Sequence, residues 1–286
     1  MTMRRALIVG LTTLLVGLIG VGAALGIVYG EPDGGEHPFV GSLVIRINTG
    51  ELAGIYQWCS GTLMQGAGEA AGSDVFLTAG HCVVGLDTLI EEIFGVPFED
   101  ADILVTFDEV ISTGSTFFEV PFADVHWDPR FGTQGMADLF DMAVLDLNTS
   151  TGINQYGALP PAGLLDDLKA SGQLKDQIFT AVGYGTIRET RKGGFAGILD
   201  NLQRNKGDQS FLSLTNAWMT MSMNEATGNS GTCYGDSGGP HFLEGTNSLV
   251  SLTVTGDSVC KATDRTYRLD TGSAQSFLEE WVALNG

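Results

Sequence analysis

Short apolar runs separated by turn-forming residues recur along most of this chain, and they constrain its fold more than any other feature. The runs have the length of strands, and Gly, Asp, Asn or Thr interrupts them. Glycine occupies 40 of the 286 positions, which provides many sites for tight turns. The sequence therefore predicts an all-β protein. The predicted strands cover residues 39–47, 75–78, 103–110, 117–120, 142–147, 178–182, 217–223, 249–255 and 267–269.

The stretch 149–175, which is rich in Gly, Pro and Asp, separates these strands into two sets. A chain of 286 residues can form one large or two modest domains, and the composition shift near residue 150 predicts a boundary. The end of the chain differs, because apolar residues at helical spacing follow two possible capping residues, Asp270 and Thr271. We expect a short terminal helix within 271–284, with one face formed by Phe277, Leu278, Trp281 and Val282.

The first 26 residues have a different composition from the rest. Arg4 and Arg5 lead into an uncharged apolar stretch, 6–26, that ends in small residues. This pattern predicts a signal peptide, 1–26, and hence a secreted protein, extracellular or periplasmic. The alternative is an uncleaved membrane anchor, because the stretch is long enough to span a bilayer. Its glycines and its small-residue end favour cleavage, and the remainder is expected to be soluble.

The formal net charge is −20, with 34 acidic against 14 basic side chains. Phosphate binding requires a basic face, so this balance argues against nucleic acid as a partner. A solvated surface is the simplest reason for the charge. Acidic residues gather within 91–102, and they form either an exposed loop, which is the default, or a calcium site. These residues are Glu91, Glu92, Glu99, Asp100 and Asp102.

The chain contains four cysteines, Cys59, Cys82, Cys233 and Cys260. An even number in an exported chain predicts two disulfides. Three pairings are possible, and pairing Cys59 with Cys82 and Cys233 with Cys260 closes the two shortest loops. A zinc site is the competing interpretation, but the sequence has no Cys-x-x-Cys spacing and its histidines do not cluster.

The segment Gly235-Asp236-Ser237-Gly238-Gly239-Pro240 is the strongest local signal for chemistry. Glycine lets the main chain turn sharply, so backbone N–H groups can approach one point and bind the oxyanion of a tetrahedral intermediate. We interpret Ser237 as a nucleophile. The alternative is a Gly-rich turn between strands.

A serine nucleophile requires a base, and His81 is the best candidate because it adjoins Cys82, which could hold its loop. A carboxylate that orients the imidazole should be the third member, and Asp141 fits best at the start of an apolar run. Asp138 and Asp146 are alternatives for that carboxylate. We interpret the other histidines as surface or structural residues; they are His37, His126 and His241.

Three motifs in this order resemble the trypsin-like serine proteases: Thr-Ala-Gly-His-Cys, Asp-Met-Ala-Val-Leu and Gly-Asp-Ser-Gly-Gly-Pro. The resemblance spans about 27–281. It implies two antiparallel six-stranded β-barrels, about 27–150 and 151–270, with the active site between them. It further implies a triad of His81, Asp141 and Ser237, and an oxyanion hole from the N–H groups of Gly235 and Ser237. The disulfide pairing with the shortest loops also matches the family.

The resemblance extends to the segment Ile27-Val28-Tyr29-Gly30, which is similar to the mature amino terminus of the family except at Tyr29. It implies that a free Ile27 amine inserts beside Asp236 and switches the neighbouring loop. Small residues precede Ile27 at positions that suit signal peptidase, so export cleavage alone could create this terminus. Cleavage after Ala23 or Ala24 is the alternative, and it would leave a short stub to be removed.

By the register of the motif, Gly231 and Thr232 lie at the base of a specificity pocket, and a wall is formed by Val254, Thr255 and Gly256. No acidic residue appears at this base. We therefore expect a preference for uncharged side chains rather than Arg or Lys. Arg265, near the opposite wall, leaves an acidic preference open. The basic stretch 188–206 is expected to be a solvated surface loop, with a substrate contact as the lesser possibility.

The expected function is that of a secreted serine endopeptidase, a monomer without metal or cofactor that acts on polypeptides. A catalytically silent, protease-like binding protein is one alternative, although such proteins usually lack a triad residue. An esterase with the same triad is another. The order of the triad residues and the motif around Ser237 differ from those of α/β hydrolases.

Overall fold

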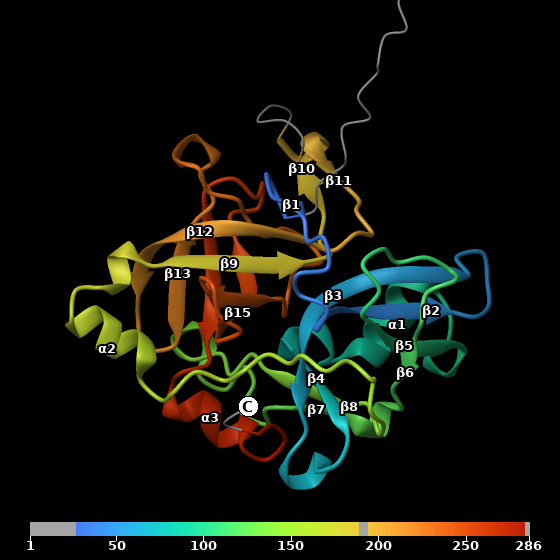
Figure 1. Ribbon diagram of the computed structural model, residues 1–286. Helices are drawn as coiled ribbons and strands as arrows, with labels where there is room; N and C mark the ends of the chain where they lie inside the picture. The colour runs from blue at the N-terminus through green and yellow to red at the C-terminus, as the bar shows by residue number, and fades with distance from the viewer. Residues whose placement is uncertain (1–26, 189–193, 284–286) are drawn as a thin grey trace, which may run out of the picture.

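The computed structural model describes residues 27–188 and 194–283, and the predicted signal peptide lies outside them. Within these residues the fold is almost entirely β (Figure 1). The strands are β1 Glu31–Pro32, β2 Val40–Ile47, β3 Gly54–Gln65, β4 Asp74–Thr78, β5 Ala101–Thr106, β6 Phe118–Glu119, β7 Val125–Trp127, β8 Ala143–Asp146, β9 Ile178–Gly183, β10 Ile187–Arg188, β11 Ile198–Leu199, β12 Asn205–Leu214, β13 Trp218–Ser222, β14 Pro240–Leu243, β15 Leu249–Gly256 and β16 Thr263–Arg268. The helices are α1 Leu86–Phe94, α2 Leu164–Ala170 and α3 Gly272–Leu278.

The first half of the chain forms a curved antiparallel sheet in the order β6-β5-β2-β3-β4-β8-β7. Its two end strands do not pair with each other in the described structure, so this unit is a half-barrel rather than a closed barrel. Both end strands are short, which limits the hydrogen bonds that could close the sheet. The first strand of this sheet along the chain is β2, and all of its eight residues except Arg46 are buried.

The second half forms a closed barrel of six strands in the order β12-β13-β16-β15-β14-β9, which a pairing between β12 and β9 completes. Closure removes the exposed edges that an open sheet would present. The expected two-barrel fold is therefore confirmed, with the difference that only the second unit closes by hydrogen bonding within the described residues. In Figure 1 the second barrel lies beside the first sheet, with α2 at its outer end.

Both ends of the described chain cross to the opposite unit. Near the amino end, β1 pairs with β12 of the second barrel. Near the carboxyl end, the chain after α3 returns to the first sheet, where Trp281 stacks on His126 with ring centroids 3.9 Å apart. The two units also share one hydrophobic core, to which Phe76 of β4 and Tyr267 of β16 both contribute. These crossings fix the two units against each other, and the site described below lies where they meet.

The terminal helix is confirmed, but it is shorter than expected. Helix α3 begins after Thr271, whose hydroxyl oxygen accepts a hydrogen bond from Ala274 N at 3.1 Å, and its Phe277 and Leu278 are buried. No helix of the described structure is long and apolar enough to cross a membrane. The expected division at residues 150 and 270 remains a prediction, although the two sheets lie within 40–146 and 178–268.

Candidate active site

His81 and Asp141 meet because they follow neighbouring strands of the first sheet. Strands β4 and β8 pair antiparallel, with Thr78 at the end of β4 opposite Ala143 at the start of β8. His81 lies three residues after Thr78 and Asp141 lies two residues before Ala143, so the two come side by side. One oxygen of the Asp141 carboxylate accepts a hydrogen bond from His81 Nδ1 at 2.7 Å, and the second accepts one from the backbone N–H of His81 at 2.7 Å. Asp141 is fully buried, whereas the His81 side chain is 34% exposed. The carboxylate therefore holds the proton on Nδ1 and leaves Nε2 as a base.

The loop that bears His81 is held in place by covalent and steric constraints. Cys82 forms a disulfide with Cys59 of β3, and its carbonyl accepts a hydrogen bond from Trp58 Nε1 at 3.0 Å. Gly80 lies against the carboxylate, since a Cβ there would be 3.2 Å from Asp141 Oδ1. These contacts fix the imidazole before any substrate binds, which lowers the cost of orienting it.

Ser237 comes from the second barrel and packs against the same strand ends. Its carbonyl accepts a hydrogen bond from Ser60 N at 2.9 Å and lies 3.8 Å from Cys82 Sγ, the residue next to His81. The following Gly238 has φ +76°, and a Cβ there would lie 2.1 Å from Thr78 Oγ1. The serine is thus adjacent to the His81–Asp141 pair. Its hydroxyl and the imidazole form no hydrogen bond among the described residues, and in free enzymes such contacts often tighten only when substrate binds.

The backbone around Ser237 presents two unpaired N–H groups. The carbonyl of Tyr234 accepts from Thr186 N at 2.7 Å, and the carbonyl of Asp236 accepts from Gly239 N at 2.8 Å. In a trans peptide the N–H points away from its carbonyl, so the N–H groups of Gly235 and Ser237 point away from these partners. Neither N–H has a hydrogen-bond partner within the described residues. Two free donors beside a serine form the arrangement that stabilises an oxyanion.

Asp236 is buried directly behind this loop, with its carboxylate between two backbone donors. Gly185 N donates to Oδ1 at 2.7 Å and Cys233 N donates to Oδ2 at 2.9 Å. Residues 183 and 185 must be glycine, because a Cβ at either would lie within 2.4 Å of this carboxylate. Burial raises the pKa of Asp236 from 3.8 to about 7 despite the two hydrogen bonds. Among residues 27–188 and 194–283, no cationic side chain forms an ion pair with this carboxylate.

The expected partner of that carboxylate, Ile27, is also fully buried. Val28 and Gly231 exchange backbone hydrogen bonds of 2.6 and 2.8 Å, which anchors the start of the chain to the loop before Ser237. In the chain as described, Ile27 follows residue 26 and its nitrogen is an amide, and no ion pair joins it to Asp236 among the described residues. Its φ of +50° is unusual for a β-branched residue.

A cavity of about 240 Å³ opens beside Ser237, and it matches most of the expected specificity pocket. Its lining includes four of the five expected residues, namely Thr232, Val254, Thr255 and Gly256. Gly231 does not line it; a Cβ at Gly231 would instead meet Met223 Sδ at 2.3 Å. The second disulfide, Cys233–Cys260, joins two walls of the cavity and confirms the expected pairing.

An acidic residue that the sequence analysis did not consider lies behind this cavity. The expected preference for uncharged substrate side chains rested on Gly231 and Thr232 as the floor of the specificity pocket. The buried Asp264 carboxylate accepts a hydrogen bond from Thr232 Oγ1 at 2.7 Å. Arg265, the residue considered near the opposite wall, instead lies over the Trp218 ring, 4.4 Å from its centroid, and does not line the cavity.

The alternatives for the base and its carboxylate all have other partners. Asp138 accepts a hydrogen bond from Tyr267 OH at 2.6 Å, and Asp146 accepts one from Ser73 Oγ at 2.6 Å. His37 bonds to Asp33 through Nδ1 at 2.5 Å. The two other histidines, His126 and His241, are engaged with Trp281 and Asp264 respectively.

The expected surface role of the basic stretch 188–206 is only partly correct. Residues 189–193 lie outside the described structure, whereas Arg188 and Arg204 are buried. Arg204 donates to Asp33 Oδ2 at 2.9 Å. Burial raises the pKa of Asp33, but the hydrogen bonds from His37, together with the charge of Arg204, lower it to about 2.

The metal sites considered from sequence find little support in the described structure. Among the described residues, the one group with metal-ligand spacing is Cys59, His81 and Cys82, and its two cysteines are joined in a disulfide. In the acidic stretch, Asp102 pairs with Arg46 at 2.5 Å and Asp100 accepts a hydrogen bond from Thr49.

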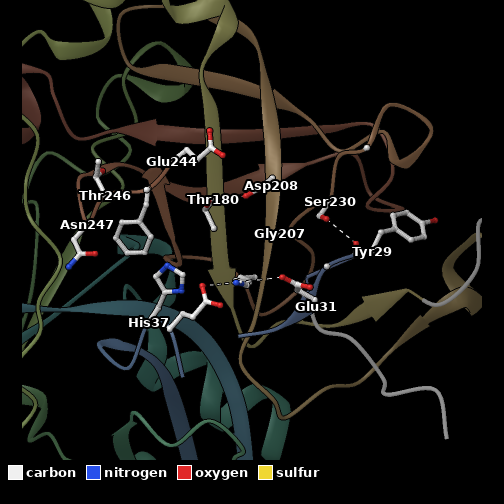
Figure 2. Close-up of a pocket in the computed structure, with 16 residues that line it drawn as sticks. Tyr29, Glu31, His37, Thr180, Gly207, Asp208, Ser230, Glu244, Thr246 and Asn247 are labelled. Atoms are coloured by element: carbon white, nitrogen blue, oxygen red, sulfur yellow. Dashed lines mark hydrogen bonds and ion pairs between the residues drawn. The ribbon is translucent and has the colours of Figure 1, made fainter. Parts of the chain in front are cut away.

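A larger cavity, of about 500 Å³, lies elsewhere along β1, β9 and β12 and does not include Ser237 (Figure 2). Several of its charged groups are already engaged. Lys206 contacts Glu31 and Glu36, at 3.5 and 2.7 Å, and Asp208 accepts a hydrogen bond from Thr180 at 2.9 Å. Size alone would favour this cavity, but it lacks a nucleophile beside a base, so the smaller cavity at Ser237 is the candidate site.

Comparison with known proteins agrees with this geometry. The family model described as Trypsin matches residues 27–275. Among solved structures, HL collagenase is similar in fold, with a TM-score of 0.59 and 18% sequence identity over 89% of this chain and 97% of that chain. At that identity the likeness concerns the fold alone. No curated protein matches the sequence.

Proposed function

Because the chain belongs to the trypsin family of serine proteases, we propose that it is a serine endopeptidase whose nucleophile, base and orienting carboxylate are Ser237, His81 and Asp141. The observation that supports this best is the position of Ser237, beside the His81–Asp141 pair and in a loop where the N–H groups of Gly235 and Ser237 have no partner among the described residues. None of these components is sufficient by itself, but together they provide all the groups that acyl transfer requires.

In the proposed reaction, Ser237 Oγ attacks the carbonyl carbon of the scissile peptide bond while His81 Nε2 takes the hydroxyl proton. The imidazolium that forms is stabilised by the buried Asp141 carboxylate 2.7 Å away. His81 then gives the proton to the departing amine. A water molecule, activated by the same imidazole, hydrolyses the acyl-enzyme and regenerates the serine.

The N–H groups of Gly235 and Ser237 are proposed to bind the oxyanion of both tetrahedral intermediates. Their peptide planes are fixed by hydrogen bonds on the carbonyl sides, so little reorganisation accompanies the reaction. The Gly235 carbonyl is itself held by Gln57 Nε2 at 2.9 Å and by Ser60 Oγ at 3.0 Å. A preorganised donor of this kind contributes about 10² to 10³ in rate.

Labelling with a serine-reactive fluorophosphonate tests this assignment. We expect one labelled site, Ser237, and complete loss of labelling in Ser237→Ala. Ser213→Ala, an exposed serine on β12, serves as the matched control and should label normally. A folded protein that does not react would instead support the catalytically silent binding protein.

Peptide and ester substrates of matched sequence separate the endopeptidase from the esterase alternative. Both reactions share the acyl-enzyme step, so labelling does not distinguish them. We expect cleavage of internal peptide bonds, measured by mass spectrometry of the products. Hydrolysis of esters alone, at protein concentrations that exhaust the ester, would favour the esterase.

We also propose that the protein is exported and that removal of residues 1–26 frees the Ile27 amine to pair with Asp236. The burial of both residues and the raised pKa of the unpaired carboxylate support this proposal. Two disulfides are consistent with an oxidising compartment, extracellular or periplasmic. Amino-terminal sequencing of the exported protein is the test, and any start other than Ile27 rules out activation by export cleavage alone.

A further inference from the structure

Ser60, on β3 of the first sheet, is fully buried and contacts several segments around the catalytic loop. Its backbone N–H donates to the Ser237 carbonyl at 2.9 Å, and its own carbonyl accepts a hydrogen bond from Thr78 Oγ1 at 2.8 Å. Its hydroxyl donates to the Gly235 carbonyl at 3.0 Å and accepts a hydrogen bond from the backbone N–H of Tyr184 at 3.0 Å. This one residue therefore ties the loop that bears the nucleophile to both units of the fold.

The Ser60 hydroxyl is used both as a donor and as an acceptor. A hydroxyl has one proton to donate, and Gly235 receives it, while a lone pair accepts the Tyr184 N–H. Neighbouring glycines shape the space around this side chain. A Cβ at Gly183 would lie 3.2 Å from Ser60 Oγ, and a Cβ at Gly239 would lie 3.2 Å from Ser60 Cβ. The position thus suits a small side chain that can bridge these two backbone groups.

Gly235 is the residue that this bridge restrains, and its φ of +91° lies where side chains are rarely tolerated. Such a residue turns freely unless the peptide planes on both sides of it are held. The plane before it is held by the bond from Thr186 N to the Tyr234 carbonyl at 2.7 Å. The plane after it is held by Ser60 Oγ and by Gln57 Nε2 at 2.9 Å. Together these contacts fix the direction in which the Gly235 N–H points.

The same hydroxyl also reaches the segment that supports Asp236. Tyr184 N donates to Ser60 Oγ, and the N–H of the next residue, Gly185, donates to Asp236 Oδ1 at 2.7 Å. Two adjacent links, one through the Ser60 hydroxyl and one through the Asp236 carboxylate, therefore join residues 184–185 to residues 235–236. Loss of the first link leaves a buried N–H without its partner and releases one of the contacts on the Gly235 carbonyl.

We propose that Ser60 is a positioning residue for the oxyanion hole, and that it acts through the Gly235 carbonyl together with Gln57. The inference rests on the proposed peptidase function. Ser60 is buried behind the loop, so it influences the reaction only through the direction of the Gly235 N–H. Because the oxyanion develops during the reaction and is absent from the bound substrate, this influence belongs in kcat rather than in KM.

The first test compares Ser60→Ala with Ser42→Ala in steady-state peptide cleavage. Ser42 is a matched control because it lies opposite Ser60 on β2 and is equally buried, while its hydroxyl contacts the carbonyls of Leu43 and Cys59. We expect Ser60→Ala to lower kcat about tenfold and to leave KM within about twofold of wild type. Ser42→Ala should keep both constants within about twofold, even if urea unfolding shows that it is destabilised.

The second test measures the oxyanion hole directly with a peptide aldehyde and the corresponding peptide alcohol, both with the sequence of the best-cleaved substrate. Ser237 Oγ adds to the aldehyde carbon, the carbonyl oxygen becomes the oxyanion, and His81 takes the serine proton. The alcohol occupies the same subsites but forms no adduct. We expect Ser60→Ala to raise the inhibition constant of the aldehyde about tenfold and that of the alcohol less than about twofold.

If Ser60→Ala does not fold, Gln57→Leu removes the other donor to the same carbonyl from a half-buried position, and it should weaken the aldehyde more than the alcohol. Equal weakening of the two inhibitors, or a Ser60→Ala enzyme with the kinetics of Ser42→Ala, overturns the role of Ser60 and leaves the peptidase assignment intact. Folded Gln57→Leu with unchanged kcat and aldehyde inhibition also overturns it. A wild-type protein that neither labels at Ser237 nor cleaves peptides refutes the peptidase assignment before any variant is compared.

Discussion

The Asp236 carboxylate should make folding stability depend on pH in a way that reveals the state of the amino terminus. The perturbation is the removal of residues 1–26, comparing protein that begins at Ile27 with the full chain of 286 residues. In the longer form no ammonium lies beside Asp236, and its pKa remains near 7. In the shorter form the Ile27 ammonium favours the ionised carboxylate, which lowers that pKa.

The sign and size of the effect follow from the two pKa values of Asp236, about 7 when folded and 3.8 when unfolded. Between these two pKa values the Asp236 carboxyl keeps its proton in the folded longer form but has lost it in the unfolded chain. The contribution of Asp236 to stability is therefore complete below pH 4 and is lost as the pH rises toward 7. At about 1.4 kcal/mol per pH unit, the loss amounts to about 4 kcal/mol. This is a large part of the stability of a typical domain. The shorter form should lose less, because its folded-state pKa is lower.

Urea unfolding followed by tryptophan fluorescence between pH 4 and pH 8 measures this difference. Both forms would carry Ser237→Ala, which prevents autolysis. The side chains of residues 27–286 are common to both forms, so the difference between the curves isolates the amino terminus. Asp236→Asn in the longer form should remove the excess loss. Identical pH dependence in the two forms, or no change on Asp236→Asn, would refute the reasoning.

Three further predictions concern the parts of the site. Gly238→Ala should destabilise the fold by about 2 kcal/mol or more, because its Cβ would lie 2.1 Å from Thr78 Oγ1; urea unfolding that matches wild type would contradict this. Asp141→Asn should lower kcat about 10⁴-fold while the melting temperature changes little, since the fold keeps its packing but the imidazole loses its proper tautomer. Replacing Cys59 and Cys82 together by alanine should cost about 3 kcal/mol of stability and reduce kcat more than KM, which steady-state kinetics would check.

The sequence predicted best those features that depend on local chemistry. His81, Asp141 and Ser237 each stand in a short segment whose composition reflects the contacts of that residue, such as Gly80 against the carboxylate. Spacing left three disulfide pairings open, and the one with the shortest loops, which the family resemblance also implied, is the one observed. The strands found from apolar runs, such as 39–47 and 178–182, coincide closely with β2 and β9.

Longer elements were missed where their residues do not form apolar runs. Strand β3, with twelve residues, contains only short apolar stretches because its first half is partly exposed. Strand β12, with ten residues, has only Leu214 as an apolar residue on its buried positions, which otherwise hold Asn205 and Gln209. The helices α1 and α2 are short and begin after glycines, without a side-chain cap that would signal their start.

The missed strand β12 and the missed acid Asp264 have one cause, which is the polar interior of the second barrel. A search for apolar runs assumes that buried positions are hydrophobic, but Gln209, His241 and Asp264 are buried and bonded to one another. The predicted strand 267–269 began too late for the same reason, because β16 starts at Thr263 and alternation places Asp264 inside. Such a costly interior persists only if something compensates it. In the described structure the compensation comes from the three hydrogen bonds that Asp264 Oδ2 accepts, from Thr232, Gln209 and His241.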